Sequence, residues 1–153
     1  LSATLRWFSN HTENKDQNKM MLIGIPWVEL GRSLVGCDCY GLVKLYYSRL
    51  GVLLPDYTPD KNRDWILKSE ESGFPALHMF EEVGKKDIQK NDIVWIKMFD
   101  PEMGGICNHL AVYVGDGNLL ETTKGTGSVL VRLSRREKLI KKVFRYKGET
   151  WQE

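Results

Sequence analysis

Two cysteines stand two residues apart in the segment GCDCYGLV, residues 36–43, where a polar stretch passes into an amphipathic one. Apolar side chains follow Cys39 at the spacing of one helical face; they are Leu42, Val43, Tyr46 and Leu50. We therefore predict a helix over residues 39–50, ended by Gly51. A thiol in the first turn of a helix lies among N–H groups without helical partners and near the positive end of the helix dipole, which favours the reactive thiolate. The position of Cys39 thus predicts a nucleophile, with its own backbone N–H as a donor to an oxyanion.

A thiol nucleophile in acyl transfer needs a base, and His109 opens a segment, HLAVYVGDG at residues 109–117, that supplies one. The segment is typical of the first arm of a β-hairpin. If the loop is the three residues 115–117, Ala111 lies opposite Glu121, and His109 and Glu121 are diagonal neighbours on one face, about 7–8 Å apart at Cα. A two-residue turn would put them on opposite faces and remove Glu121 from the site. We therefore expect an odd-length loop with a bulge, and we expect Glu121 to orient His109.

Two further side chains, Asp38 and Trp27, are candidate substrate contacts. Asp38 directly precedes the nucleophile. It can either cap the predicted helix or project into the cleft and bind a cationic group of a substrate, and we favour the capping role.

The elements that must position these groups come in two blocks, helices first and strands after. A second helix is expected over residues 60–73, followed by a short helix or irregular segment over 74–83. Strands are expected over residues 92–97, 109–114, 119–123, 128–133 and 143–146, with a helical turn over 134–141 that Ser134 caps. This order predicts an α+β fold in which N-terminal helices pack on a mostly antiparallel sheet. We expect residues 20–153 to form one catalytic domain, and residues 1–19 to be an N-terminal extension of unclear role.

Composition excludes several classes of protein. With 22 Lys and Arg against 20 Asp and Glu, the chain carries a net charge near +2, which does not indicate a nucleic-acid partner. No apolar run approaches the roughly 20 residues of a membrane span. Three cysteines are an odd number, which argues against a closed disulfide framework. The chemistry predicted for the thiol requires no cofactor and no metal.

Other interpretations of the same residues stay open at this stage. A cysteine in an amphipathic helix is most often a packing residue. Zinc is a second alternative, since four soft ligands occur in two pairs; they are Cys37, Cys39, Cys107 and His109. Residues 132–147 hold eight basic side chains and one acid, which is typical of a solvated face but could also favour an anionic polymer. Trp65 and Trp95 are expected in the core.

Taken together, these segments resemble the NlpC/P60 family of cell-wall cysteine peptidases, which have a papain-like fold. Residues 24–27, GIPW, are similar to the family's Gly-Thr-Pro-Tyr segment, and residues 36–43 to its Asp-Cys-x-Gly-Leu-Val signature. Residues 109–117 are similar to its His-x-Gly-Ile-Tyr-x-Gly-x-Gly hairpin. The resemblance implies that Cys39 is the nucleophile and that Glu121 stands at the third polar position, where the family commonly has His.

Residues 31–43, with LG at 50–51 and LPDY at 54–57, are most similar to the family members carried by phage and prophage tails. The resemblance implies hydrolysis of an amide bond in peptidoglycan stem peptides, usually after D-glutamate and before a diamino acid. It also implies a place in the virion tail tip, with other tail-tip proteins as partners and the bacterial cell wall as the site of action. Two alternatives remain: a structural part of the tail tip that keeps the fold, and a related amidase or acyltransferase.

Overall fold

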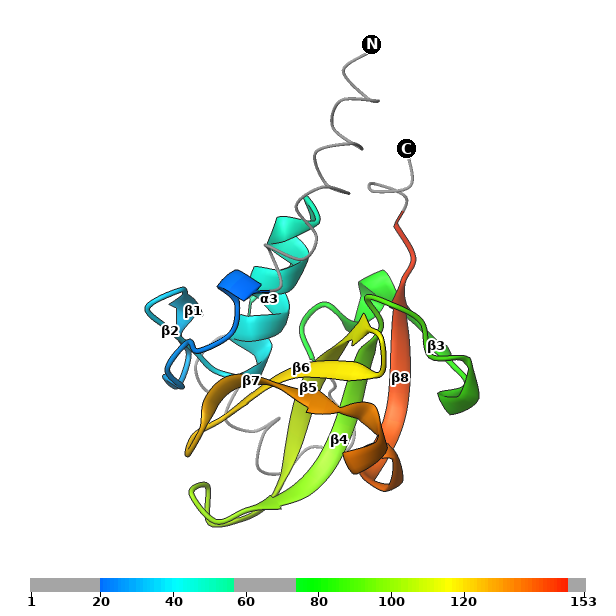
Figure 1. Cartoon of the computed structure of the whole chain (residues 1–153). Coiled ribbons are helices and arrows are strands. Elements are labelled where there is room, and N and C mark those ends of the chain that lie inside the picture. The colour runs from blue at the N-terminus through cyan, green and yellow to red at the C-terminus, as the bar shows by residue number, and fades with distance from the viewer. Residues whose placement is uncertain (1–19, 57–73, 149–153) are drawn as a thin grey trace.

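The computed structural model describes residues 20–56 and 74–148, which form one α-helix packed against a six-stranded sheet (Figure 1). The helix is α3 (Cys39–Arg49). The strands are β1 (Arg32–Ser33), β2 (Gly36–Cys37), β3 (Phe80–Val83), β4 (Ile93–Asp100), β5 (Gly105–Gly115), β6 (Asn118–Thr123), β7 (Gly127–Arg132) and β8 (Ile140–Tyr146). Four 3₁₀ turns connect them: η1 (Leu77–Met79), η2 (Lys85–Asp87), η3 (Leu133–Arg135) and η4 (Glu137–Leu139).

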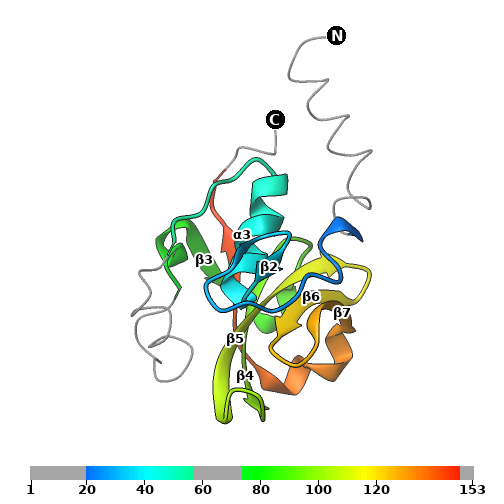
Figure 2. The ribbon, with the colours of Figure 1, turned by 90° about the vertical axis from the view of Figure 1, so that its left-hand side faces the viewer.

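The large sheet has the strand order β3-β8-β4-β5-β6-β7, and every pairing in it is antiparallel. Helix α3 packs against β5 and β6, and the small β1–β2 hairpin packs against α3. Figure 2, which views the molecule from the left-hand side of Figure 1, shows α3 and β2 in front of the sheet. The α+β class predicted from the order of the elements is therefore confirmed. No helix among the described residues is long and apolar enough to cross a membrane.

Local sequence explains where α3 begins and ends. Asp38 has extended backbone angles, and its side chain accepts a hydrogen bond from the backbone N–H of Gly41, which is the geometry of an N-cap. Leu50 is the C-cap, and Gly51 follows with a φ of +83°, a left-handed conformation that favours glycine. Of the predicted apolar face, Leu42, Val43 and Tyr46 are buried and Leu50 is partly buried.

Two hydrogen bonds attach the last turns of α3 to the start of β4. The hydroxyl of Tyr46 donates to the side-chain oxygen of Asn91, and the hydroxyl of Tyr47 donates to the backbone carbonyl of the same residue. At the other end of the helix, Gly41 allows close approach of the backbone, because a Cβ there would lie 2.1 Å from the carbonyl oxygen of Gly31. Both ends of the helix are thus fixed, and Cys39 in the first turn has a defined position relative to the sheet.

Two expectations about elements need correction. The segment expected to be a helical turn capped by Ser134 is two 3₁₀ turns, η3 and η4, neither of which has a side-chain cap. Residues 74–83 contain the expected short helix, as the 3₁₀ turn η1, but they end in an unexpected strand, β3, which pairs with β8 and gave no alternating pattern in the sequence. The short strands β1 and β2 were also not predicted. The helix expected over residues 60–73 and the extension over residues 1–19 lie outside the described residues.

Candidate active site

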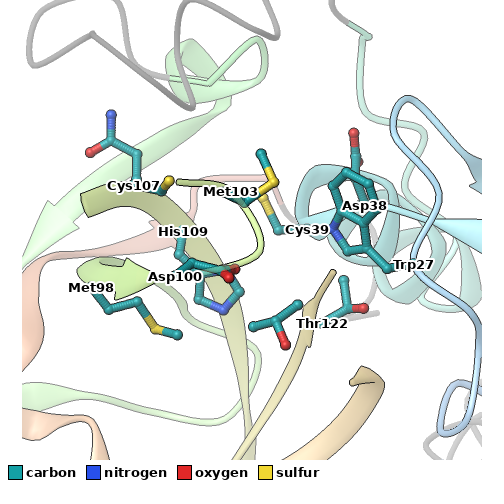
Figure 3. Close-up of a pocket in the computed structure, with 11 residues that line it drawn as sticks. Trp27, Asp38, Cys39, Met98, Asp100, Met103, Cys107, His109 and Thr122 are labelled. Carbon is teal, nitrogen blue, oxygen red and sulfur yellow. The ribbon is translucent and has the colours of Figure 1, made fainter. Parts of the chain in front are cut away.

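An open cleft of about 370 Å³ lies where the N-terminus of α3 meets the middle of the sheet. It is lined by side chains from the segment before β1, from α3, from the β4–β5 hairpin and from the end of β6; they are Trp27, Asp38, Cys39, Met98, Asp100, Met103, Cys107, Asn108, His109, Thr122 and Thr123. Figure 3 shows Cys39 and Trp27 on one side of the cleft, with His109 and Asp100 on the other. Segments far apart in the sequence therefore bring the predicted nucleophile and the predicted base to one cleft.

The side chains of Cys39 and Glu121 determine the pKa of the His109 imidazole. Burial disfavours the charged imidazolium, but interactions with the side chain of Cys39 and the carboxylate of Glu121 outweigh it and raise the pKa of His109 to about 9. Cys39 is 6% exposed and His109 is 7% exposed, so both are buried residues in the lining of the cleft. A protonated imidazole beside a thiol at a helix N-terminus is the arrangement that stabilises a thiolate.

The carboxylate of Glu121 lies next to the imidazole of His109. Its Oε1 lies 3.8 Å from Nε2 of His109, which is within ion-pair range and longer than a hydrogen bond. Within the described residues, Nε2 has no hydrogen-bond partner at a shorter distance. The Glu121 side chain is almost completely buried, and the guanidinium of Arg136 binds both of its oxygens. Burial alone would raise the pKa of Glu121, but His109 and Arg136 together lower it to about 2, so the carboxylate stays ionised.

The hairpin that brings His109 and Glu121 together differs from the expected one in its turn. Gly115 pairs with Asn118, so the turn is the two residues Asp116 and Gly117, both with positive φ. The predicted bulge is present, because the register between β5 and β6 shifts between Tyr113 and Gly115. The expectation of an odd-length loop was therefore wrong. The inference that a two-residue turn would remove Glu121 from the site was also wrong, since the bulge restores the register.

The two candidate substrate contacts have different surroundings. The carboxylate of Asp38 is fully buried and accepts hydrogen bonds from the backbone N–H groups of Leu30 and Gly41 and from Nη1 of Arg32. The structure thus supports the capping role that the sequence favoured. Trp27 is half-buried at the rim of the cleft, with the Nζ of Lys124 5.9 Å from the centre of its ring.

The other two cysteines lie in less reactive surroundings. Burial, with the nearby charge of Asp38, raises the pKa of Cys37 to about 12, and burial also raises the pKa of Cys107. Among the described residues, no group of three or more His, Cys, Asp or Glu side chains is arranged to hold a metal ion. The zinc alternative therefore lacks its predicted ligand set. Trp95 is buried as expected, and its indole N–H donates to the side chain of Asn108.

Sequence reasoning missed Arg136, which it placed in a basic stretch typical of a solvated face. It also gave no indication that Met98 and Met103 form apolar walls of the cleft. Thr122 is a third omission, since its hydroxyl is buried at the cleft without a hydrogen-bond partner in the described part of the chain. No sequence pattern indicated it, because alternation along β6 would by itself place Thr122 and Glu121 on opposite faces.

Comparison with known proteins agrees with the family resemblance noted in the sequence. The family model of the NlpC/P60 family matches residues 24–148. A gamma-D-glutamyl-L-lysine dipeptidyl-peptidase of Bacillus cereus is 27% identical over 110 residues, which cover 71% of this chain and 28% of that protein. The chain thus spans about a third or less of the length of the curated relatives that it matches.

Solved structures show the same fold. An NlpC/P60 family protein from Bacillus cereus superposes with a TM-score of 0.61 at 23% identity, covering 90% of this chain and 40% of that one. RipD from Mycobacterium tuberculosis superposes with a TM-score of 0.59 at 16% identity, covering 90% of this chain and 98% of that one. RipD is described as a non-catalytic NlpC/p60 domain protein adapted to a peptidoglycan-binding function.

Proposed function

Because the chain belongs to the NlpC/P60 family, we propose that it is a cysteine hydrolase that cleaves an amide bond in peptidoglycan stem peptides. The observation that carries the proposal is the convergence of Cys39 and His109 on one cleft, with the carboxylate of Glu121 3.8 Å from Nε2 of His109. The substrate class is supported by the relatives, one of which is named for a bond between γ-D-glutamate and L-lysine.

The proposed reaction uses each group for one task. His109 first takes the proton of the Cys39 thiol, which gives a thiolate–imidazolium pair. The thiolate then attacks the amide carbonyl, and the Cys39 N–H in the first helical turn donates to the developing oxyanion. Nε2 of His109 faces Glu121, so Nδ1 is the nitrogen that exchanges the proton with Cys39. The C–N bond then breaks, the leaving amine takes the proton from His109, and a thioester remains on Cys39. Water, deprotonated by His109, hydrolyses the thioester and regenerates the thiol.

The test is digestion of purified peptidoglycan and defined stem peptides, with mass analysis of the products. The wild-type chain should release new amino groups, and Cys39→Ala should release none. Cys37→Ser is the matched control, because it removes a thiol two residues away that the proposal does not use. Equal release by wild type and Cys39→Ala would refute the proposal. An added amine acceptor separates hydrolysis from acyl transfer, since a transferase would form a new amide with it.

We also propose, from the similarity of residues 31–57 to tail-borne members of the family, that the domain acts in a phage tail tip against the cell wall of the host. Residues 20–153 would be its catalytic domain, and neighbouring tail-tip proteins would be its partners. Virions labelled with antibody against this chain should carry the label at the tail end. Label on the capsid alone, or absent from virions, would contradict this location.

A second candidate function is binding to peptidoglycan without cleavage, favoured by the match to RipD over nearly its whole length. Co-sedimentation with insoluble peptidoglycan tests it. Binding by the wild-type chain with no release of amino groups would support this candidate over the hydrolase.

A further inference from the structure

In the basic stretch over residues 132–147, Arg136 forms its ion pair with Glu121, the carboxylate next to His109. Arg136 Nε donates to Glu121 Oε1 at 3.0 Å, and Arg136 Nη2 donates to Glu121 Oε2 at 3.0 Å. Two parallel N–H···O bonds of this kind fix the plane of a carboxylate as well as its position, which a lysine cannot do. The Arg136 side chain is 22% exposed and the Glu121 side chain 2% exposed, so solvent screens this pair less than a surface ion pair.

The backbone holds Arg136 in this place. The residue lies at the junction of η3 and η4, where its N–H donates to the carbonyl of Leu133 at 2.9 Å and its own carbonyl accepts from Leu139 at 2.8 Å. The backbone of Arg136 therefore takes part in a hydrogen bond of each 3₁₀ turn. Its side chain starts from a fixed point and reaches β6 from a segment that follows Glu121 by 15 residues.

We propose that Arg136 is a positioning residue for the catalytic groups: by holding the Glu121 carboxylate in one orientation and in its ionised form, it lets Glu121 stabilise the His109 imidazolium that pairs with the Cys39 thiolate. The inference rests on the proposed cysteine chemistry. A carboxylate has about four lone-pair directions, so the two that Arg136 occupies leave others for Nε2 of His109. The 3.8 Å between Nε2 and Oε1 is short enough for a small movement to close when the imidazolium forms.

Few other charges act on Glu121, which makes the role of Arg136 testable. His109 from β5 and Arg136 from the η3–η4 junction are the charged groups that shift its pKa. On the other side, β7 presents the uncharged Val129 opposite Glu121. From α3, Cys39 acts on His109. A buried carboxyl that loses its arginine takes up a proton more readily, and a neutral Glu121 cannot stabilise the imidazolium.

The experiment measures how fast iodoacetamide alkylates Cys39 as a function of pH, followed by peptide mapping, because alkylation reports the thiolate and needs no substrate. Arg136→Gln should move the acid limb of the rate profile up by about one to three pH units, the range by which an arginine lowers the pKa of a neighbouring carboxylate. Arg135→Gln is the matched control. Arg135 is exposed, carries the same charge one residue away, and should leave the profile unchanged.

Two further variants separate positioning from folding. Arg136→Lys keeps the charge without the two parallel bonds, so its acid limb should lie between those of the wild type and Arg136→Gln. In a Glu121→Gln background, Arg136→Gln should cause no additional shift, since Arg136 acts through the carboxylate. A merely structural arginine would instead add a loss in that background, and such an additional loss would overturn the inference.

The two proposals fail in different ways. Identical alkylation profiles for Arg136→Gln and Arg135→Gln would overturn the role of Arg136, whether or not the chain cleaves peptidoglycan. If the wild-type chain cleaves no peptidoglycan but the acid limb still moves in Arg136→Gln alone, the positioning role stands and only the proposed substrate is wrong.

Discussion

The Glu121 carboxylate faces the His109 imidazole because β5 carries one more residue than β6 before the turn that joins them. Tyr113 pairs with Leu119, and the next pair is Gly115 with Asn118, so Val114 has no partner of its own. Side chains alternate along a strand, and one unpaired residue reverses which face the following residues occupy. Without it, the two-residue turn would place His109 and Glu121 on opposite faces of the sheet. The charged groups of the site thus depend on one bulge.

Gly115 closes this bulge with a φ of +90°, a conformation that costs a residue with a Cβ roughly 1–2 kcal/mol. We expect Gly115→Ala to lower the free energy of unfolding by about that amount, measured by urea denaturation. Space is not the reason, because the nearest atom to an added Cβ is the flexible side chain of Lys90 at 3.5 Å. Gly105→Ala, at the other end of β5 where φ is not positive and no atom lies within 4 Å, is the control and should cost little. Equal losses would disprove the backbone explanation.

The β5–β6 hairpin shows which features of the site could be predicted from the sequence alone. His109 and Glu121 are 12 positions apart, an even number, so the alternation in residues 109–114 predicted a shared face only if one extra residue interrupted the pairing. The alternation could not show whether the extra residue lies in the loop or in the strand, because both solutions give the same register. The structure places it in the strand, next to a turn with two positive φ angles.

Arg136 could not have been found in the same way. Its distance from Glu121 along the chain is not a helical or strand period, and it lies in 3₁₀ turns whose side-chain directions depend on tertiary packing. The local composition instead indicated a solvated basic face, yet three of its arginines form hydrogen bonds with other segments of the chain. Arg132 donates to the backbone of Asp116, and Arg145 binds the buried Asp92.

Selective alkylation of Cys39 is the simplest check on the thiol chemistry. At pH 7, a pKa of about 12 leaves Cys37 as thiolate in only on the order of one molecule in 100,000. We expect one equivalent of iodoacetamide to label Cys39 in preference to Cys37 by more than about a hundredfold, and also in preference to Cys107, whose pKa burial raises, as read by peptide mapping. Replacing His109 by Ala should slow the labelling of Cys39 and leave the other two unchanged. Even labelling of the three thiols would remove the case for an activated nucleophile.

The pKa of His109 also predicts how stability varies with pH. The folded chain holds the His109 proton up to about pH 9, whereas the unfolded chain releases it near pH 6.5. Its contribution is therefore complete below pH 6.5 and is lost as the pH rises towards 9. Glu121 has the opposite sign, since its pKa is lowered: its contribution is present above pH 4.5 and is lost as the pH falls towards 2.

We expect the free energy of unfolding of the wild-type chain to decline between pH 6.5 and 9, and this decline to be smaller in His109→Gln. Chemical denaturation at a series of pH values measures both curves. If His109→Gln declines as steeply as the wild type, His109 does not carry a raised pKa in the folded state.

Thr122 offers a test of whether the cleft is built for a ligand at the expense of stability. Its hydroxyl oxygen is buried beside the cleft and has no hydrogen-bond partner in the described residues, which costs a folded protein about 1–3 kcal/mol. Valine has the same shape without the hydroxyl. We therefore expect Thr122→Val to keep or raise the free energy of unfolding, while kcat/KM on stem peptides falls about five- to tenfold, or roughly 1 kcal/mol of transition-state binding.

Thr126→Val, in the exposed loop before β7, is the control for the general effect of removing a hydroxyl, and both of its measurements should match the wild type. Opposite movement of stability and kcat/KM in Thr122→Val is the decisive feature, because a hydroxyl that only supports the fold would lower both together. A drop in stability with unchanged kcat/KM would show that Thr122 has a partner inside the protein. In that case the cleft would recognise its substrate through the walls formed by Trp27, Met98 and Met103.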